Sequence, residues 1–101
     1  MQLTKERKLE ILNSSISELK GLISKENYSY GICFLIAMYI TEEEHRELIA
    51  ENYSNIILSL FPEIIKFNPG NICGWWFKKD FNGALKRLSI LKETIKEVEN
   101  A

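Results

Sequence analysis

NPGNICGWWFKKDFNG, the stretch at residues 68–83, interrupts a chain whose remaining sequence is typical of helices. It contains both tryptophans, two of the five phenylalanines, one of the two cysteines and three of the five glycines. Glycine and proline predict a turn-rich loop here, because glycine tolerates positive φ angles and proline cannot continue a helix. The chain is therefore expected to form helices on both sides of one aromatic loop.

The aromatic loop is the candidate binding site. Its three consecutive large rings cannot all face one core in a helix or a strand, so at least one is expected to face solvent, a groove or a partner. Two lysines follow directly, and rings stack on nucleobases while cationic groups attract phosphates. The alternative is that the tryptophans close one open end of a small helical bundle. The predicted ligand-binding residues are Trp75, Trp76, Phe77, Lys78, Lys79 and Arg87.

Length and composition indicate one ordinary domain. The 101 residues are 46% apolar and 27% charged, so residues 1–101 are expected to form a single helical domain. The net charge of −1 argues against general nucleic-acid binding, and the apolar run at residues 32–40 is too short to span a bilayer. No secretory leader opens the sequence, which predicts a cytoplasmic protein. Cys33 and Cys73 are then expected to remain thiols, with a disulfide between them as the alternative.

Apolar spacing predicts an all-α fold, a small four-helix bundle with the aromatic loop before its last helix. The first helix is expected over residues 4–24, with a core-facing stripe whose alternative role is a dimer seam. That stripe consists of Leu9, Leu12, Ile16, Leu19 and Ile23. Residues 31–40 are almost wholly apolar, which predicts a helix at the centre of the bundle, with a buried strand as the competing interpretation.

The third and last helices have clear start signals. Thr41 to Glu44 form a capping box, and Pro62 should end the helix that follows. Residues 63–67 fit either a short helical turn or a short extended piece, and Asp80 or Asn82 should cap the last helix. The expected apolar faces are Leu48, Ile49, Tyr53, Ile56, Ile57 and Leu60 on the third helix, and Phe81, Leu85, Leu88, Leu91, Ile95 and Val98 on the last. Arg87 is expected to lie off that last face.

Charge and surplus apolar residues predict self-association. Residues 41–60 carry five glutamates against one arginine, while residues 62–92 carry six basic residues against two acidic ones. These segments either attract each other, within or between subunits, or form a basic pocket around the aromatic loop. Further apolar residues lie outside the stripes, namely Leu3, Ile11, Leu22, Phe61, Ile64 and Phe67. We therefore expect a homo-oligomer, most simply a dimer, with any ligand pocket near the subunit boundary.

Recognised catalytic and metal-binding patterns are missing from the sequence. The only histidine, His45, follows Glu42 at the i, i+3 spacing of di-iron bundles, but only one copy of the pair occurs. Two cysteines forty residues apart make no zinc pattern, and there is neither a phosphate-binding P-loop nor a nucleophile elbow. We expect a protein that is not an enzyme and uses no cofactor and no metal.

A resemblance places these features in a biological context. Gly31-Ile32-Cys33 at the start of an apolar helix, Trp75-Trp76-Phe77 in the late loop and Arg87-Leu88 on the last helix resemble small helical accessory proteins of bacteriophages and prophages. The resemblance covers residues 28–95, although Phe77 stands where that group has proline. It implies counter-defence in the host cytoplasm by non-covalent binding, with a nucleotide immune signal as the ligand that is sequestered. The alternative is an inhibitor that binds a host defence protein through the aromatic loop.

Overall fold

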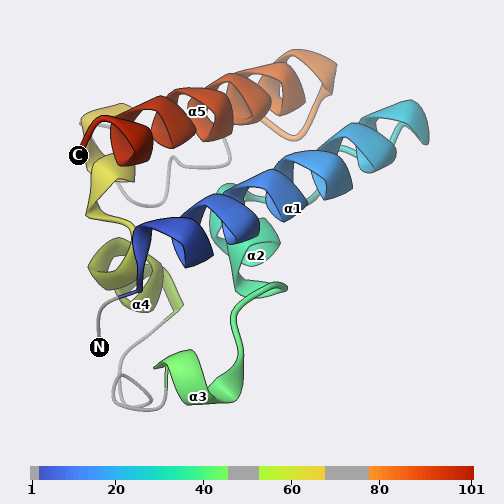
Figure 1. The fold of residues 1–101 in the computed structure, drawn as a ribbon. Helices are drawn as coiled ribbons and strands as arrows, with labels where there is room; N and C mark the ends of the chain where they lie inside the picture. The colour runs from blue at the N-terminus through green and yellow to red at the C-terminus, as the bar shows by residue number, and fades with distance from the viewer. Residues whose placement is uncertain (1–2, 46–52, 68–77) are drawn as a thin grey trace.

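The structure is a computed structural model that describes residues 3–45, 53–67 and 78–101. The regular elements of these residues are α1 (Lys5–Ser24), α2 (Ile32–Ala37), α3 (Glu42–His45), α4 (Tyr53–Leu60), the 3-10 helix η2 (Pro62–Phe67) and α5 (Phe81–Glu99) (Figure 1). The predicted all-α class is confirmed for the described part of the chain, where no strand occurs. A four-helix bundle is not confirmed, because only α1 and α5 of the described helices are long and the others are short.

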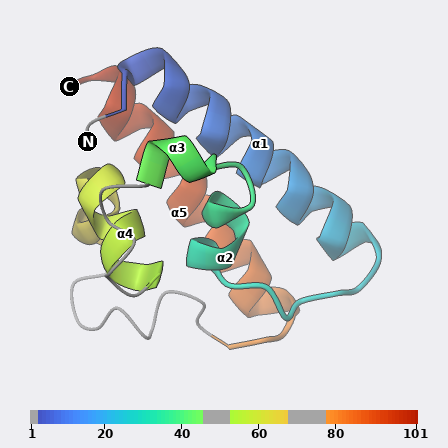
Figure 2. The ribbon, with the colours of Figure 1, turned by 90° about the horizontal axis from the view of Figure 1, so that it is seen from below.

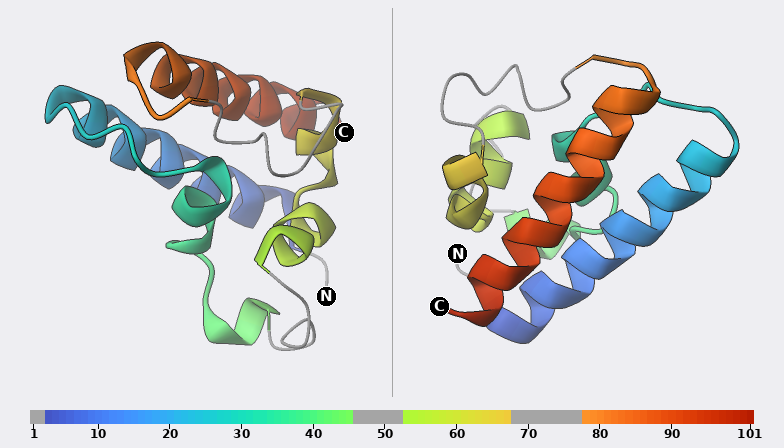
Figure 3. Two further views of the ribbon diagram at one scale, coloured as in Figure 1. Left: turned by 180° about the vertical axis from the view of Figure 1, so that it is seen from behind. Right: turned by 90° about the horizontal axis from the view of Figure 1, so that it is seen from above.

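The two long helices form one side of the molecule. α1 and α5 run antiparallel, and Lys5 Nζ donates to the carbonyl oxygen of Glu99 at 2.7 Å, so the start of α1 lies beside the end of α5. The short helices α2, α3 and α4 all lie against one face of this pair (Figures 2 and 3). The two long helices diverge toward the end of α1 and the start of α5, and the loop after α1 crosses this open end (Figures 2 and 3).

Helix α1 begins and packs much as its sequence predicts. Thr4 Oγ1 accepts a hydrogen bond from the N–H of Arg7 at 3.1 Å, which caps the helix. Its buried residues are Ile11, Leu12, Ser15, Ile16 and Leu19. The placement of Ile11 outside the core stripe was wrong, because α1 packs against both α5 and α2 and therefore buries a broader face than one stripe.

The core gathers residues that the sequence analysis had assigned to a subunit contact. Leu3, Ile11, Phe61 and Ile64 are all buried within one chain, together with residues of α2, α4 and α5. Leu22 and Phe67 are partly buried against the same cluster. The apolar residues at these positions, one of the two reasons for predicting a homo-oligomer, are therefore covered within one chain, and self-association stays a prediction.

Helix α2 is shorter than expected and is not buried on every side. It begins after Gly31 and ends at Ala37, followed by a turn at Met38 and Tyr39. Phe34 is 52% exposed and Met38 45% exposed, so the prediction of a helix buried all round was wrong. The helical interpretation itself is confirmed over residues 32–37, and the strand interpretation is wrong there. Cys33 is buried on this helix, whereas Cys73 lies outside the described residues.

The capping box and the proline both act as predicted. The N–H of Glu44 donates to Thr41 Oγ1 at 3.3 Å, and the N–H of Thr41 donates to Glu44 Oε1 at 2.9 Å. Helix α4 ends at Leu60, before Pro62, and residues 62–67 form a 3-10 helix rather than an extended piece. Leu48 and Ile49, predicted for the same helical face, lie outside the described residues. Within the part of the chain that is described, no helix combines the length and apolar character needed to cross a membrane.

Candidate functional site

Helix α5 packs most of its predicted apolar face against the core, but the first two residues of that face are exposed. Asp80 Oδ1 accepts from the N–H of Gly83 at 2.7 Å and caps the helix, as expected. The buried residues that follow are Gly83, Ala84, Arg87, Ile90, Leu91, Thr94 and Val98. Phe81 is 48% exposed and Leu85 41% exposed, so both were wrongly assigned to the buried face. Leu91 and Val98 are buried, and Leu88 and Ile95 are partly buried against the core, so these four were correctly assigned. The buried positions 84, 87, 91, 94 and 98 follow helical spacing and include an arginine, Arg87.

Arg87 is fully buried and uses its guanidinium inside the protein. Nη1 donates to the carbonyl oxygen of Lys78 at 3.0 Å, and Nη2 donates to the carbonyl oxygen of Tyr28 at 2.7 Å. Burial lowers the pKa of Arg87 from its ordinary value, while the nearby carboxylate of Asp80 acts in the opposite direction. The prediction that Arg87 lies on the surface was wrong. In this structure its charge is directed at two backbone carbonyls rather than toward a ligand.

Lys78 reaches Arg87 because its backbone lies directly on the first turn of α5. A Cβ atom on Gly83 would lie 1.8 Å from the carbonyl oxygen of Lys78, well inside contact distance. Glycine is therefore needed at this position for the approach of another backbone segment. The sequence shows a glycine three positions after the cap residue. The need for glycine there cannot be predicted from the sequence, because the contact with the Lys78 carbonyl forms only in the folded chain.

Replacing Gly83 with alanine should lower the free energy of unfolding by about 1–2 kcal/mol, measured by chemical denaturation. Alanine favours a helix by up to about 1 kcal/mol over glycine, but overpacking costs about 1–3 kcal/mol, and the obstructing atom is backbone. Gly21→Ala in α1 is the matched control, since nothing lies within 4 Å of its added Cβ, and it should stabilise the protein. Stabilisation by both substitutions would contradict the close approach.

Tyr28 and Phe81 bring two distant segments together at the open end of the long helices. Their rings pack edge to face, with centroids 6.0 Å apart and planes inclined at 69°. Tyr28 belongs to the loop after α1 and Phe81 is the first residue of α5, and these segments lie side by side (Figures 2 and 3). Arg87 holds the backbone of the same loop.

We define the Phe81 surface as the exposed residues at the start of α5. They are Lys78, Lys79, Phe81, Leu85 and Lys86. Phe81 and Leu85 are four residues apart and so lie on one side of the helix. Asp80, an exposed acidic residue next to this surface in the sequence, caps the helix. The structure thus places two of the predicted site residues, Lys78 and Lys79, beside half-exposed apolar side chains. Trp75, Trp76 and Phe77 lie outside the described residues.

No protein-family model matches the sequence, and comparisons with curated proteins and with solved structures give no match. We therefore infer function from the contacts of this chain's own residues.

A shallow pocket lies at the opposite end of α5. Its volume is about 120 Å³, and it is lined by Leu3, Lys5, Lys8, Glu63, Val98 and Ala101. Lys8 Nζ and Glu63 Oε2 lie 2.9 Å apart, so these two charges already form an ion pair. Pockets that enclose small molecules usually measure roughly 300–1,000 Å³. This pocket is therefore a poor site for a nucleotide. Across residues 3–45, 53–67 and 78–101, no group of three or more histidine, cysteine or carboxylate side chains is placed to hold a metal ion.

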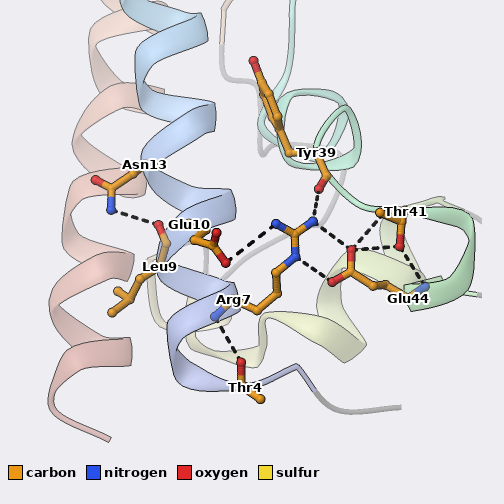
Figure 4. Close-up of polar contacts among 8 residues, drawn as sticks. All are labelled: Thr4, Arg7, Leu9, Glu10, Asn13, Tyr39, Thr41 and Glu44. Carbon is orange, nitrogen blue, oxygen red and sulfur yellow. Dashed lines mark hydrogen bonds and ion pairs between the residues drawn. The ribbon is translucent and has the colours of Figure 1, made fainter.

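A cluster of polar side chains joins α1 to α3 and has a structural role (Figure 4). Arg7 Nε donates to Glu44 Oε2 at 2.7 Å, and Arg7 Nη2 donates to Glu44 Oε1 at 2.9 Å and to the carbonyl oxygen of Tyr39 at 2.8 Å. The hydrogen bonds from Arg7, followed by those from Thr41, lower the pKa of Glu44 to about 2. A carboxylate whose oxygens accept these internal hydrogen bonds stabilises the fold and is a poor general acid or base at neutral pH.

Proposed function

We propose that this chain is a phage-type accessory protein that acts in the host cytoplasm by non-covalent binding. Its partner would be an acidic host defence protein that docks on the Phe81 surface. The choice of a protein partner rather than a nucleotide rests on one observation. Phe81 and Leu85 remain half-exposed on a capped helix, and Lys78, Lys79 and Lys86 border them. Interfaces combine an apolar centre with a polar rim in this way.

The two apolar side chains supply a modest and specific part of the affinity. Full burial of a phenylalanine or leucine side chain contributes roughly 1.5–3 kcal/mol. Since Phe81 and Leu85 already lie half-buried, covering the remainder contributes about 1 kcal/mol each on the same scale. The lysines add selectivity for carboxylates and faster association with an acidic partner. Leu85 favours a protein over a nucleotide, because an aliphatic side chain offers a base no ring to stack on.

Sequestration of a nucleotide immune signal is the second candidate. It is supported by the half-exposed Phe81 and the exposed Lys78 and Lys79 near it in the sequence, a combination of ring and ammonium groups that suits a base and a phosphate. It is weakened by Arg87, whose bidentate guanidinium would have been the strongest phosphate ligand of the predicted set. We therefore rank the protein partner first.

Replacing Phe81 and Leu85 together with alanine should weaken partner binding about 100-fold, because truncating central interface residues typically costs about 1–2 kcal/mol each. The partner is first captured from bacterial lysate, identified by mass spectrometry and purified. Its dissociation constant for each variant is then measured by calorimetry. The double variant Phe34→Ala, Met38→Ala is the matched control, since that pair is also four residues apart and similarly exposed, but lies on α2 and its C-cap.

The outcomes separate the candidates. Binding that is lost in the Phe81 and Leu85 variant and retained in the control supports the docking surface. Equal affinities in all three proteins would refute it. A nucleotide that co-purifies with the wild-type chain in native mass spectrometry, with no protein captured, would replace the first candidate by the second.

A further inference from the structure

We infer that Arg87 is a clamp that holds together the two chain segments on which the Phe81 surface is built. The inference deepens the proposed function, because the clamp would set the geometry of the proposed surface, but its test requires no partner. One segment is the loop after α1, which contains Tyr28, and the other contains Lys78 and leads into α5. Arg87 donates to one backbone carbonyl in each.

The geometry of arginine suits this task. The two acceptors come from residues 59 and 9 positions away in the sequence, so no local element can set the distance between them. A guanidinium presents its N–H groups in a rigid planar fork, which fixes the relative positions of the carbonyls it binds. Both carbonyls lie outside the helices, where regular backbone bonding does not provide a partner. Arg87 therefore replaces the missing regular structure at the open end of α1 and α5.

Three further contacts hold the same segments. Gly83 lets the carbonyl of Lys78 approach the first turn of α5, and the Asp80 cap fixes the residues in between. On the other side, the ring of Tyr28 packs against the ring of Phe81, which belongs to the proposed surface itself. Movement of either segment would separate Arg87 from one acceptor. Because a buried charged donor without its acceptor is costly, the two segments are expected to open together rather than separately.

A closed clamp would prepare the surface before binding. The position of Phe81 depends on the start of α5, and that of Tyr28 depends on the loop after α1. If one guanidinium fixes both, the partner does not have to order them, which lowers the entropic cost of association. Arg87 would then be a positioning residue, which affects recognition from a buried place without touching the partner.

Site-specific proteolysis tests the clamp directly. Endoproteinase Lys-C cleaves after lysine, and the peptide bond after Lys78 contains the carbonyl that Arg87 holds. Cleavage tracks the population of the locally opened state when opening is fast. In Arg87→Met, cleavage after Lys78 and after Lys25, which precedes Tyr28 by three residues, should both rise about tenfold relative to cleavage after Lys96, equivalent to about 1.4 kcal/mol. Lys96 serves as the internal reference because it lies in the last turn of α5.

A second variant covers the case in which Arg87→Met unfolds the whole chain, which a uniform rise at all three sites would reveal. Gly83→Ala keeps Arg87 but places a Cβ atom where the carbonyl oxygen of Lys78 packs against α5. Cleavage after Lys78 should again rise relative to Lys96. The clamp is overturned if Lys78 stays as protected in Gly83→Ala as in the wild type. It is also overturned if a folded Arg87→Met variant exposes Lys78 while Lys25 keeps its wild-type rate.

Discussion

Replacing Phe61 with alanine should lower the free energy of unfolding by about 3–5 kcal/mol, the usual cost of removing a large buried aromatic side chain. Phe61 is fully buried between α4 and η2. Its N–H donates to the carbonyl of Ile57 at 2.8 Å, and its carbonyl accepts from Ile64 at 3.1 Å, so the backbone contacts should survive the substitution. Because domains of this size are stable by only about 5–15 kcal/mol, much of the stability would be lost. Urea denaturation followed by circular dichroism measures the change.

Ile65→Ala provides the control for Phe61. Ile65 lies on the 3-10 helix that follows Phe61 but is half-exposed, so its truncation should cost less than about 1 kcal/mol. Light scattering on the same samples tests the predicted homo-oligomer. A Phe61→Ala variant that keeps its monomer stability but falls from dimer to monomer mass would contradict the burial of Phe61 within one chain. It would restore the intersubunit role predicted from the sequence.

Replacing Glu44 with glutamine should lower the free energy of unfolding by about 2–3 kcal/mol at neutral pH. The substitution keeps the shape of the side chain but removes the charge that accepts two hydrogen bonds from Arg7. Breaking a buried ion pair costs about 3–5 kcal/mol, and the partial exposure of Arg7 reduces that figure here. Thermal or chemical denaturation measures the loss. Glu10→Gln is the control, because Glu10 is well exposed and lies 4.0 Å from the same arginine, so its change should be much smaller.

The contribution of Glu44 should disappear in acid. Its pKa in the folded protein is about 2, below the ordinary 4.5, so the folded state favours the ionised carboxylate. A lowered folded-state pKa contributes stability that is fully present above about pH 4.5 and is lost as the pH falls through about 2, with a total of about 3 kcal/mol for this shift. The stability difference between wild type and Glu44→Gln should therefore shrink between pH 5 and pH 2. A difference in unfolding free energy between the two proteins that stays constant across that pH range would contradict a stabilising Arg7–Glu44 ion pair.

Local signals in the sequence predict where the helices begin and end. Thr4 and Asp80 cap α1 and α5, the capping box starts α3, and Pro62 follows the end of α4. Each of these features works within about three residues of the chain, through a side chain that satisfies a nearby backbone group. Such interactions do not depend on the rest of the fold, which explains why the sequence alone suffices for them.

The orientation of α5 depends on contacts that the sequence pattern does not contain. Two apolar stripes overlap on this helix, and the one that includes Phe81 and Leu85 has the more hydrophobic residues. Leu88, Leu91, Ile95 and Val98 of that stripe do pack against the core. Arg87 is buried as well, and its acceptors at Tyr28 and Lys78 come within reach only in the folded chain. The candidate site was consequently predicted in part. Lys78 and Lys79 lie on the surface, Arg87 does not, and the exposed apolar pair was missed.

The antiparallel pairing of α1 with α5 also constrains when the chain can fold during synthesis. Lys5 and Glu99 meet across 94 positions of sequence, so the contact between α1 and α5 joins two helices that are synthesised far apart in time. Until α5 is complete, the buried face of α1 has only the short helices to cover it. Contacts of such long range make folding slower and leave apolar surface exposed in the meantime. The nascent chain therefore exposes part of the buried face of α1 until α5 has been synthesised.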